Sequence, residues 1–296
     1  MERLAIIDLG TNTFNLLVVE REKDTYKELA VEREGVGLGL GGINEQKIAP
    51  EAFDRGLTAL ARFKQICDEF GIKKVFPFGT SAIRNATNKF DFIEAVRQQV
   101  GLDIQVISGE QEAEFIYKGV AFGLTYTEPY FIMDIGGGST EFIFADQNGI
   151  IKAKSFEIGA ARIFQKYTFS DPLSNADIED IEAYLEEHTE GFFDDVEAKM
   201  LVGASGSFET FYELITGLNY PKHKYVSPNK DHFDYFIDRI LKSTQAERDL
   251  EDRIIPIRKK MAPIAAVKIR WIIRKLGIRK VTISPNSLKE GVLYDL

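Results

Sequence analysis

The sequence predicts an α/β protein made of two copies of one domain, each built around a mixed β-sheet. Short apolar runs alternate along the chain with segments in which apolar residues recur at helical spacing. The layout of residues 4–33 (a strand, a tight loop, a strand, a turn and a strand) also returns 126 residues later. No linker rich in Pro, Gly or Ser separates the halves. We therefore expect an internal duplication whose two domains are joined directly, with a cleft between them.

In the first half we expect three strands, a long helix, and then two buried strands with a second helix between them. Pro50 suits the first turn of the long helix, and Gly71 is placed to end it. The segment Gly35–Gly42 can be an irregular connection or a mobile lid, and we favour the connection. The predicted strands are Leu4–Asp8, Phe14–Glu20, Tyr26–Arg33, Val75–Phe78 and Ile104–Ile107, with a charged turn at Lys23–Asp24 and the second helix through Phe92–Val100.

The second half opens with the same three-strand layout, and its Asn148–Gly149 dipeptide is typical of a tight hairpin turn. An acidic helix, a strand, three more helices, a strand and a closing helix are predicted after it. We divide the chain into a first domain of residues 1–117 and a second of residues 118–296. The predicted elements of the second half are Tyr130–Met133, Glu141–Asp146, Ile150–Glu157, residues 175–190, Met200–Val202, residues 208–216, 233–241 and 260–276, Val281–Ser284 and Leu288–Tyr294.

The composition is that of a globular protein. The chain has 296 residues, of which 44% are hydrophobic and 28% charged, and a domain usually has roughly 150 residues. The longest uncharged stretch, Leu9–Val19, is too short to span a bilayer, and Asp8 interrupts the apolar run that a signal peptide would need. The single cysteine, Cys67, excludes a disulfide within the chain and a cysteine metal cluster. We expect a cytoplasmic protein with no membrane partner.

Charge is unevenly distributed. The net charge of −9 disfavours a nucleic-acid-binding protein. Asp171–Lys199 contains eleven acids and one base, whereas Arg253–Lys280 contains ten bases and no acid. We favour the interpretation of the basic stretch as either a solvated helix face or an internal partner of the acidic one. The alternative is a track for a polyanionic substrate. On a helical wheel, one half carries Lys259, Lys260, Lys268, Arg270, Arg274 and Lys275, and the other carries Met261, Ala265, Ile269, Ile272 and Leu276.

Three loops consist of small residues that follow a predicted strand. Glycines allow the backbone to approach a ligand closely, and successive N–H groups can then converge on phosphate oxygens. Two of these loops begin with an aspartate, Asp8 and Asp134, that can hold Mg²⁺ and its waters. The candidate phosphate-binding residues are Gly10, Thr11, Asn12, Thr13, Gly136, Gly137, Gly138, Ser139, Thr140, Gly203, Ser205, Gly206 and Ser207.

Other phosphate and hydrolase motifs are absent from the sequence. It contains neither a Walker P-loop nor a Rossmann fingerprint in its helix context. None of the three histidines lies beside a strand-end serine, which argues against a Ser-His-Asp hydrolase.

Five segments carry a resemblance to a known family. The two Asp-x-Gly loops resemble those of the actin/Hsp70/sugar-kinase superfamily. More narrowly, the chain is similar over nearly its full length to the exopolyphosphatase and guanosine-pentaphosphate phosphohydrolase (Ppx/GppA) family. The matching segments are Ile7–Phe14, Gly79–Ala86, Ile107–Glu114, Asp134–Glu141 and Leu288–Tyr294.

The resemblance implies two ribonuclease-H-like (actin-like ATPase) domains with the site between them. It also implies a hydrolase that releases terminal phosphate from inorganic polyphosphate or guanosine pentaphosphate. In that family the glutamate equivalent to Glu112 activates water and the arginine equivalent to Arg84 contacts phosphate. The family's metal-linked carboxylates correspond to Asp134 and Glu141, so the implied cofactor is Mg²⁺ or Mn²⁺. This chemistry needs charge neutralisation and an oriented nucleophile.

Departures from the family pattern leave the substrate open. Asn15 stands where His or Arg is common, Gly37 replaces a usual Arg, and Lys260 occupies a position often held by Asp. Two other functions are consistent with the residues. An ATP-dependent small-molecule kinase of the same superfamily would need an acceptor pocket with an aspartate base, and a non-catalytic polyphosphate or alarmone sensor would bind without releasing phosphate. A homodimer is left open.

Overall fold

The computed structural model describes residues 2–22 and 25–296, so the predicted turn at Lys23–Asp24 lies outside the described residues. Within them, no helix is long and apolar enough to cross a membrane. The first half contains β1 (Glu2–Leu9), β2 (Phe14–Glu22), β3 (Thr25–Glu34), α1 (Pro50–Glu69), β4 (Lys74–Gly79), α2 (Ser81–Asn85), α3 (Lys89–Val100), β5 (Gln105–Val106) and α4 (Gly109–Ala121).

The second half repeats the same succession of strands and adds more helices. It contains β6 (Tyr130–Ile135), β7 (Thr140–Asp146), β8 (Gly149–Phe156), α5 (Ala160–Lys166), α6 (Asn175–His188), β9 (Met200–Ala204), α7 (Gly206–Thr216), α8 (Lys230–Lys242), α9 (Gln245–Asp249), α10 (Pro256–Lys259), α11 (Ala262–Leu276), β10 (Lys280–Ile283) and α12 (Leu288–Asp295).

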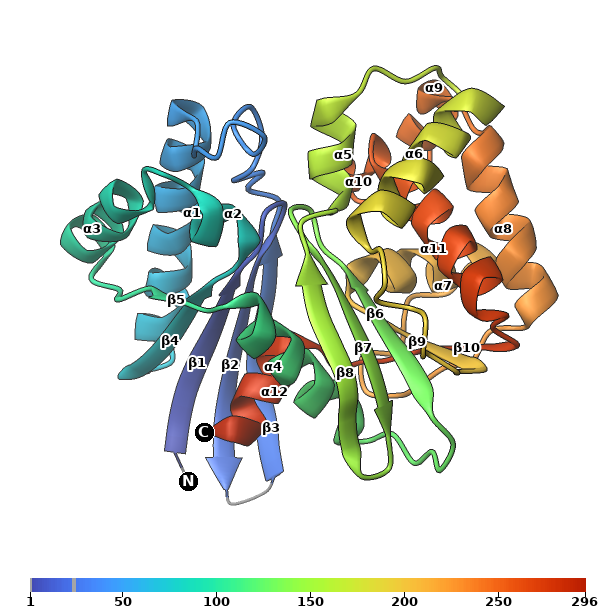
Figure 1. The fold of residues 1–296 in the computed structure, drawn as a ribbon. Helices are drawn as coiled ribbons and strands as arrows, with labels where there is room; N and C mark the ends of the chain where they lie inside the picture. Colours follow the sequence, from blue (N-terminus) through green and yellow to red (C-terminus); the bar gives the residue numbers. More distant parts are fainter. Residues whose placement is uncertain (1, 23–24) are drawn as a thin grey trace.

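The two sheets have the same topology (Figure 1). The first has the strand order β3-β2-β1-β4-β5 and the second, read from the same end, β8-β7-β6-β9-β10. In each sheet the first three strands pair antiparallel, and the last two are added in parallel. This shared order confirms the α/β class, the two mixed sheets and the internal duplication that the sequence predicted.

One predicted strand differs in burial. Of Ile104–Ile107, only Gln105 and Val106 pair with β4, and both are exposed, so the prediction of a buried strand was wrong. Ile104 and Ile107 are buried on either side of this short edge strand and join different apolar clusters. The apolar pattern of residues 104–107 therefore reflects the two buried isoleucines that flank the short strand. The short helices α2, α5, α9 and α10 were not predicted.

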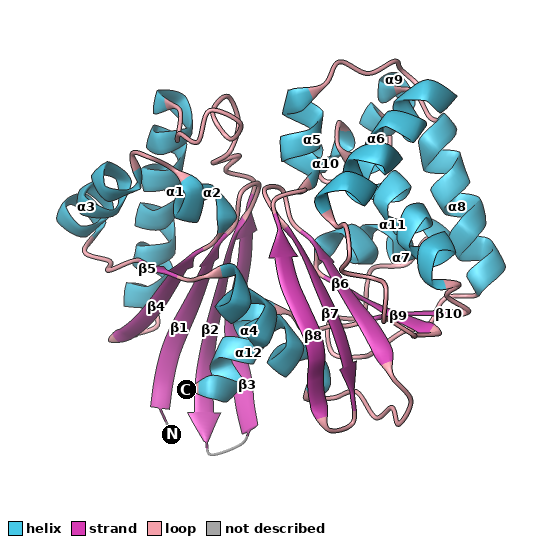
Figure 2. Ribbon diagram, in the orientation of Figure 1, coloured by secondary structure: helices cyan, strands magenta, loops and turns pink. Residues whose placement is uncertain are grey.

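Buried apolar side chains form three clusters, and Figure 2 shows the sheets and helices between which they lie. One lies between the first sheet and α1 and α3, and another between the second sheet and the helices from α5 to α11. The third lies between the two sheets, where α4 packs against β7 and β8, and α12 packs against α4 and β1. The predicted division after residue 117 falls within α4. Because the C-terminal helix α12 packs against α4 and β1, the end of the chain lies beside elements of the first half.

The segment Gly35–Gly42 is a packed connection in this structure. The N–H groups of Gly37 and Gly39 donate to the carbonyls of Asn12 and Thr11, at 2.9 and 3.0 Å. Arg55 Nε donates to the carbonyl of Val36 at 2.7 Å. These bonds attach the segment to the loop between β1 and β2, so it helps to shape that loop.

The basic stretch pairs with the acidic helix. On α11, Arg270 and Arg274 contact Glu182 of α6, and Lys275 contacts Glu186 at 2.5 Å. These contacts support the interpretation as an internal partner and leave no continuous basic track along α11. The placement of Lys268 on a solvated face was wrong, because this side chain is fully buried.

Reversing the charge of Arg270 and Arg274 together, to Glu, is expected to destabilise the fold. Two carboxylates would then face Glu182, and we expect a loss of about 1–3 kcal/mol in the free energy of unfolding. Thermal unfolding and the salt dependence of KM for long polyphosphate would be measured. A double reversal of the exposed Lys222 and Lys224 makes the same change in net charge as a control. An unchanged melting temperature with selective loss of long-chain affinity would restore the track interpretation.

Candidate active site

Three acidic side chains reach the layer between the sheets because side chains alternate along a strand. In β1, Ile6 is buried in this layer, and Asp8, two residues further on, faces the same side. Asp134 on β6 and Glu141 on β7 follow the same rule, and they are direct cross-strand partners. All three line one open cleft, whose empty space of about 1260 Å³ includes the solvent at its mouth.

Most predicted site residues line this cleft. Arg84, Thr140 and Gly203 are not among the residues that line it. Gly203 is inside β9, where a Cβ would fall 2.1 Å from the ring of Phe208, so this glycine accommodates a core aromatic and not a ligand. The predicted residues that line the cleft are Asp8, Gly10, Thr11, Asn12, Thr13, Glu112, Asp134, Gly136, Gly137, Gly138, Ser139, Glu141, Ser205, Gly206 and Ser207.

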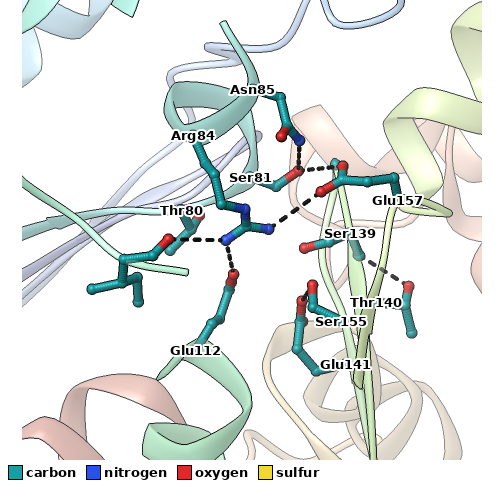
Figure 3. A network of polar contacts seen from close by, with 12 residues as sticks. Thr80, Ser81, Arg84, Asn85, Glu112, Ser139, Thr140, Glu141, Ser155 and Glu157 are labelled. Atoms are coloured by element: carbon teal, nitrogen blue, oxygen red, sulfur yellow. Dashed lines mark hydrogen bonds and ion pairs between the residues drawn. The ribbon is translucent and has the colours of Figure 1, made fainter. Parts of the chain in front are cut away.

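Glu112 reaches the cleft from the first turn of α4. Ser108 and Gln111 form a capping box that fixes where this helix begins. Only 7% of Glu112 is exposed. Its Oε2 accepts a hydrogen bond from Arg84 Nη1 at 2.7 Å, and Figure 3 shows this pair facing Ser139 and Glu141.

Two carboxylates share the Arg84 guanidinium. Its Nη2 donates to Glu157 Oε1 at 3.3 Å, while the other Glu157 oxygen accepts from Ser81 Oγ at 2.8 Å (Figure 3). That second oxygen also accepts from Arg162 Nη2 at 2.6 Å. This network joins α2 of the first half to Glu157, which directly follows β8, and to α5 of the second half. In this arrangement Arg84 orients Glu112, and its predicted contact with phosphate stays a prediction.

Burial raises the pKa of the carboxyl groups in the cleft. Burial and the neighbouring Glu141 hold the pKa of Glu112 well above its usual range, against the opposing effect of Arg84. Burial and Asp134 raise the pKa of Glu141 to about 7, and burial raises that of Asp8 to about 6. The pKa of Asp134 is also raised by burial. Ionisation of all four carboxyl groups at the same time is therefore unfavourable.

A second polar chain crosses between the halves on the other side of the site. Asn15 Nδ2 donates to Asp8 Oδ2 at 3.0 Å, and Arg33 Nε donates to Asn15 Oδ1 at 3.1 Å. Arg33 Nη1 also donates to Glu209 Oε2 on α7 at 3.0 Å. Asn15 thus holds Asp8 in place without adding charge to the cleft.

The loop Gly136–Ser139, called the glycine loop below, is supported from behind. The N–H of Gly159 donates to the Gly138 carbonyl, and that of Ala160 to the Gly136 carbonyl, both at 3.0 Å. A Cβ at Gly138 would lie 2.5 Å from Ser81 Oγ of the first half. Glycine is needed here because loops from the two halves meet at this point.

A sequence model of the Ppx/GppA phosphatase family matches residues 17–296, nearly the whole chain. The chain belongs to this family. The match begins after β1, so Asp8 and the loop that follows it lie outside the matched residues, although they line the same cleft.

Relatives of known structure confirm the fold. An exopolyphosphatase from Cytophaga hutchinsonii superposes with a TM-score of 0.95 at 34% identity, over 99% of this chain and 97% of that one. An exopolyphosphatase-like protein superposes with a TM-score of 0.90 at 25% identity, over 99% and 97%.

Curated relatives are longer than this chain. A guanosine-5'-triphosphate,3'-diphosphate pyrophosphatase from Photobacterium profundum is 26% identical over 99% of this chain and 59% of its own length. A bifunctional 3-dehydroquinate synthase/phosphatase from Fusobacterium nucleatum is 39% identical over 58% of this chain and 27% of its own length. The chain thus spans about three fifths of the first of these relatives and about a quarter of the second.

The predicted metal ligands do not form a ready-made cage. Among the described residues, no three His, Cys, Asp or Glu side chains are arranged to hold a metal ion. Asp134 accepts from Ser287 Oγ and Glu141 from Ser155 Oγ, each at 2.7 Å. Mg²⁺ in phosphoryl-transfer enzymes commonly takes only one or two carboxylates and completes its shell with water and phosphate oxygens. The buried acids of this family member suit such a site, and the metal stays a prediction.

Sequence reasoning assigned no role to several charged residues of this site. Lys289 lines the cleft within one of the segments that carry the family resemblance, and Arg258 donates to the Gly206 carbonyl at 2.7 Å. Burial lowers the pKa of Arg258 to about 10. Glu157 and Arg162 gave no sequence signal, because they meet Arg84 only after the two halves pack together.

Proposed function

We propose that this chain is a phosphoanhydride hydrolase that releases terminal orthophosphate from inorganic polyphosphate, from guanosine pentaphosphate, or from both. The observation that carries this proposal is the buried Glu112 carboxylate, which Arg84 orients in a cleft lined by two glycine-rich loops. Family membership supports the reaction class. The names of an exopolyphosphatase and a guanosine-5'-triphosphate,3'-diphosphate pyrophosphatase among its relatives support the substrate class.

The mechanism follows from the positions of these groups. The N–H groups and hydroxyls of residues 10–13 and 136–139 bind the oxygens of the terminal phosphate. Glu112 accepts a proton from a water whose oxygen forms the new bond to phosphorus. The bridging P–O bond breaks, and the shortened phosphate chain leaves with the electron pair. Arg84 holds Glu112 in place during this step.

The charge of the cleft favours a metal cofactor. Six of the lining side chains are acidic (Asp8, Glu112, Asp134, Glu141, Glu209 and Glu290), and three are basic (Arg33, Arg258 and Lys289). A polyanion would be repelled from such a cleft without an added cation. Mg²⁺ or Mn²⁺ held by one or two of the carboxylates of Asp8, Asp134 and Glu141, with water and phosphate oxygens as further ligands, would supply the neutralising charge.

One assay tests the proposal. Orthophosphate release would be measured from polyphosphate, guanosine pentaphosphate and ATP, each with Mg²⁺, with Mn²⁺ and with EDTA. We expect release from at least one of the first two substrates and none with EDTA. Tight binding without release would favour the sensor function, and consumption of ATP only with an added acceptor would favour a kinase.

As the pH is lowered, kcat/KM is expected to fall at a pH that is unusually high for a carboxylate base. A general base must be ionised, so protonation of Glu112 stops the reaction, and its raised pKa moves this loss upward. The midpoint of the acid limb of kcat/KM should lie well above 4.5, the ordinary pKa of a glutamate. Because Glu141 interacts with Glu112, the midpoint of the acid limb is an apparent pKa of the two carboxyl groups together. A plateau of kcat/KM that extends below pH 5 would contradict this assignment.

A further inference from the structure

Lys268 is a buried cation that the mechanism above does not use. It lies on α11 and is fully buried. Its Nζ donates to Thr140 Oγ1, and to the carbonyl of Ile158 at 2.5 Å. Among the described residues, no carboxylate forms an ion pair with it. An ammonium group without such a partner is costly to bury.

Both contacts lie directly behind the glycine loop. Thr140 is the residue that follows the loop, and its hydroxyl donates to the Ser139 carbonyl at 3.0 Å. Ile158 precedes Gly159, whose N–H supports the Gly138 carbonyl. Lys268 therefore bonds to the end of the loop and to the segment that supports the loop.

The buried charge has a desolvation penalty that no carboxylate partner offsets. A methionine has nearly the same length and would remove this penalty, although it would leave Thr140 Oγ1 and the Ile158 carbonyl without this donor. Burial lowers the pKa of Lys268 to about 7, and Glu141 is the charged group that opposes this effect. An anion bound in the glycine loop would favour the protonated lysine in the same way.

We propose that Lys268 is a positioning residue for phosphate: it fixes the glycine loop to the segment after β8 and supplies positive charge behind the bound anion. The inference rests on the proposed function, since it assumes that this loop binds the phosphate of the substrate. It adds a residue outside the cleft to the determinants of substrate affinity.

The test compares Lys268→Met with Lys275→Met, which removes a lysine from the same helix at a site paired with Glu186. KM and kcat for phosphate release would be measured together with thermal unfolding. We expect Lys268→Met to raise KM at least ~10-fold, the scale at which supporting residues act. Its kcat should change less than about threefold. Its melting temperature should stay close to that of the wild type, because the removed desolvation penalty and the two lost hydrogen bonds oppose each other. Lys275→Met should keep the wild-type KM.

A second readout uses sulfate, a fully ionised mimic of phosphate that cannot be hydrolysed. Calorimetry would give its affinity between pH 7 and pH 9. In the wild type, sulfate should bind more weakly as Lys268 loses its proton over this range, and Lys268→Met should flatten the dependence. Because the pKa of Glu141 is also about 7, only the part of the dependence that the substitution removes is assigned to Lys268, and Lys268→Gln replaces Lys268→Met if that variant fails to fold.

Failure of the inference differs from failure of the proposed function. The role of Lys268 would be overturned if Lys268→Met kept the wild-type KM. It would also be overturned if this variant lost kcat and thermal stability together, or if the sulfate affinity of the wild type did not change with pH. A wild-type protein that binds sulfate with this pH dependence but releases no phosphate would overturn the hydrolase and leave the anion site.

Discussion

Replacing Glu112 with Gln is expected to lower turnover by at least ~10²-fold, the usual contribution of a general base. Glutamine keeps the size of the side chain and can still contact Arg84 through its amide oxygen, but it cannot accept the proton of the attacking water. Substrate binding depends mainly on the loops, so KM should change little. Steady-state phosphate release at saturating substrate would measure the effect.

Glu110→Gln is the matched control for this variant. Glu110 lies in the same first turn of α4 but is exposed and does not line the cleft. It experiences the same helix dipole as Glu112, so it separates the role of a base from that of any acid at a helix N-terminus. Retention of more than about a third of the wild-type turnover in Glu112→Gln would show that the base lies elsewhere.

The sequence predicted the parts of the site that depend on local order. The repeated strand layout and the repeated Asp-x-Gly pattern placed Asp8 and Asp134 at equivalent strand ends, and the structure puts both in one cleft. The identity of Glu112 as the base came from the family resemblance, because an acid in the first turn of a helix is common.

What the sequence could not provide depends on how distant segments pack. Arg33 and Glu209 are 176 residues apart and meet only because β3 and α7 lie on facing sides of the site. A helical wheel assigns angles around α11 but not the neighbours of that helix. It therefore placed Lys268 with the basic residues, although Val267 and Ile269 beside it are also buried.

Substituting Asp134 with Asn or Glu141 with Gln is expected to raise the Mg²⁺ concentration for half-maximal activity at least ~10-fold, because each change removes one hard oxygen ligand of the proposed metal. Asp8→Asn should act in the same direction. Metal titrations of phosphate release would be combined with direct calorimetric binding of Mn²⁺, so that affinity is separated from turnover. Asp146→Asn, at the far end of the same strand as Glu141, is the control.

The alternative explanation makes a different prediction for the metal requirement. If these buried acids only repel the substrate and hold no metal, removing one of them should tighten sulfate binding in EDTA and leave the metal requirement unchanged. If they hold the metal, the substitutions should weaken Mn²⁺ binding and reduce phosphate affinity in its presence. Both explanations expect less repulsion in EDTA, since each variant has one acid fewer in the cleft. The metal titration is therefore decisive, and an unchanged titration in all three variants would remove the proposed metal site.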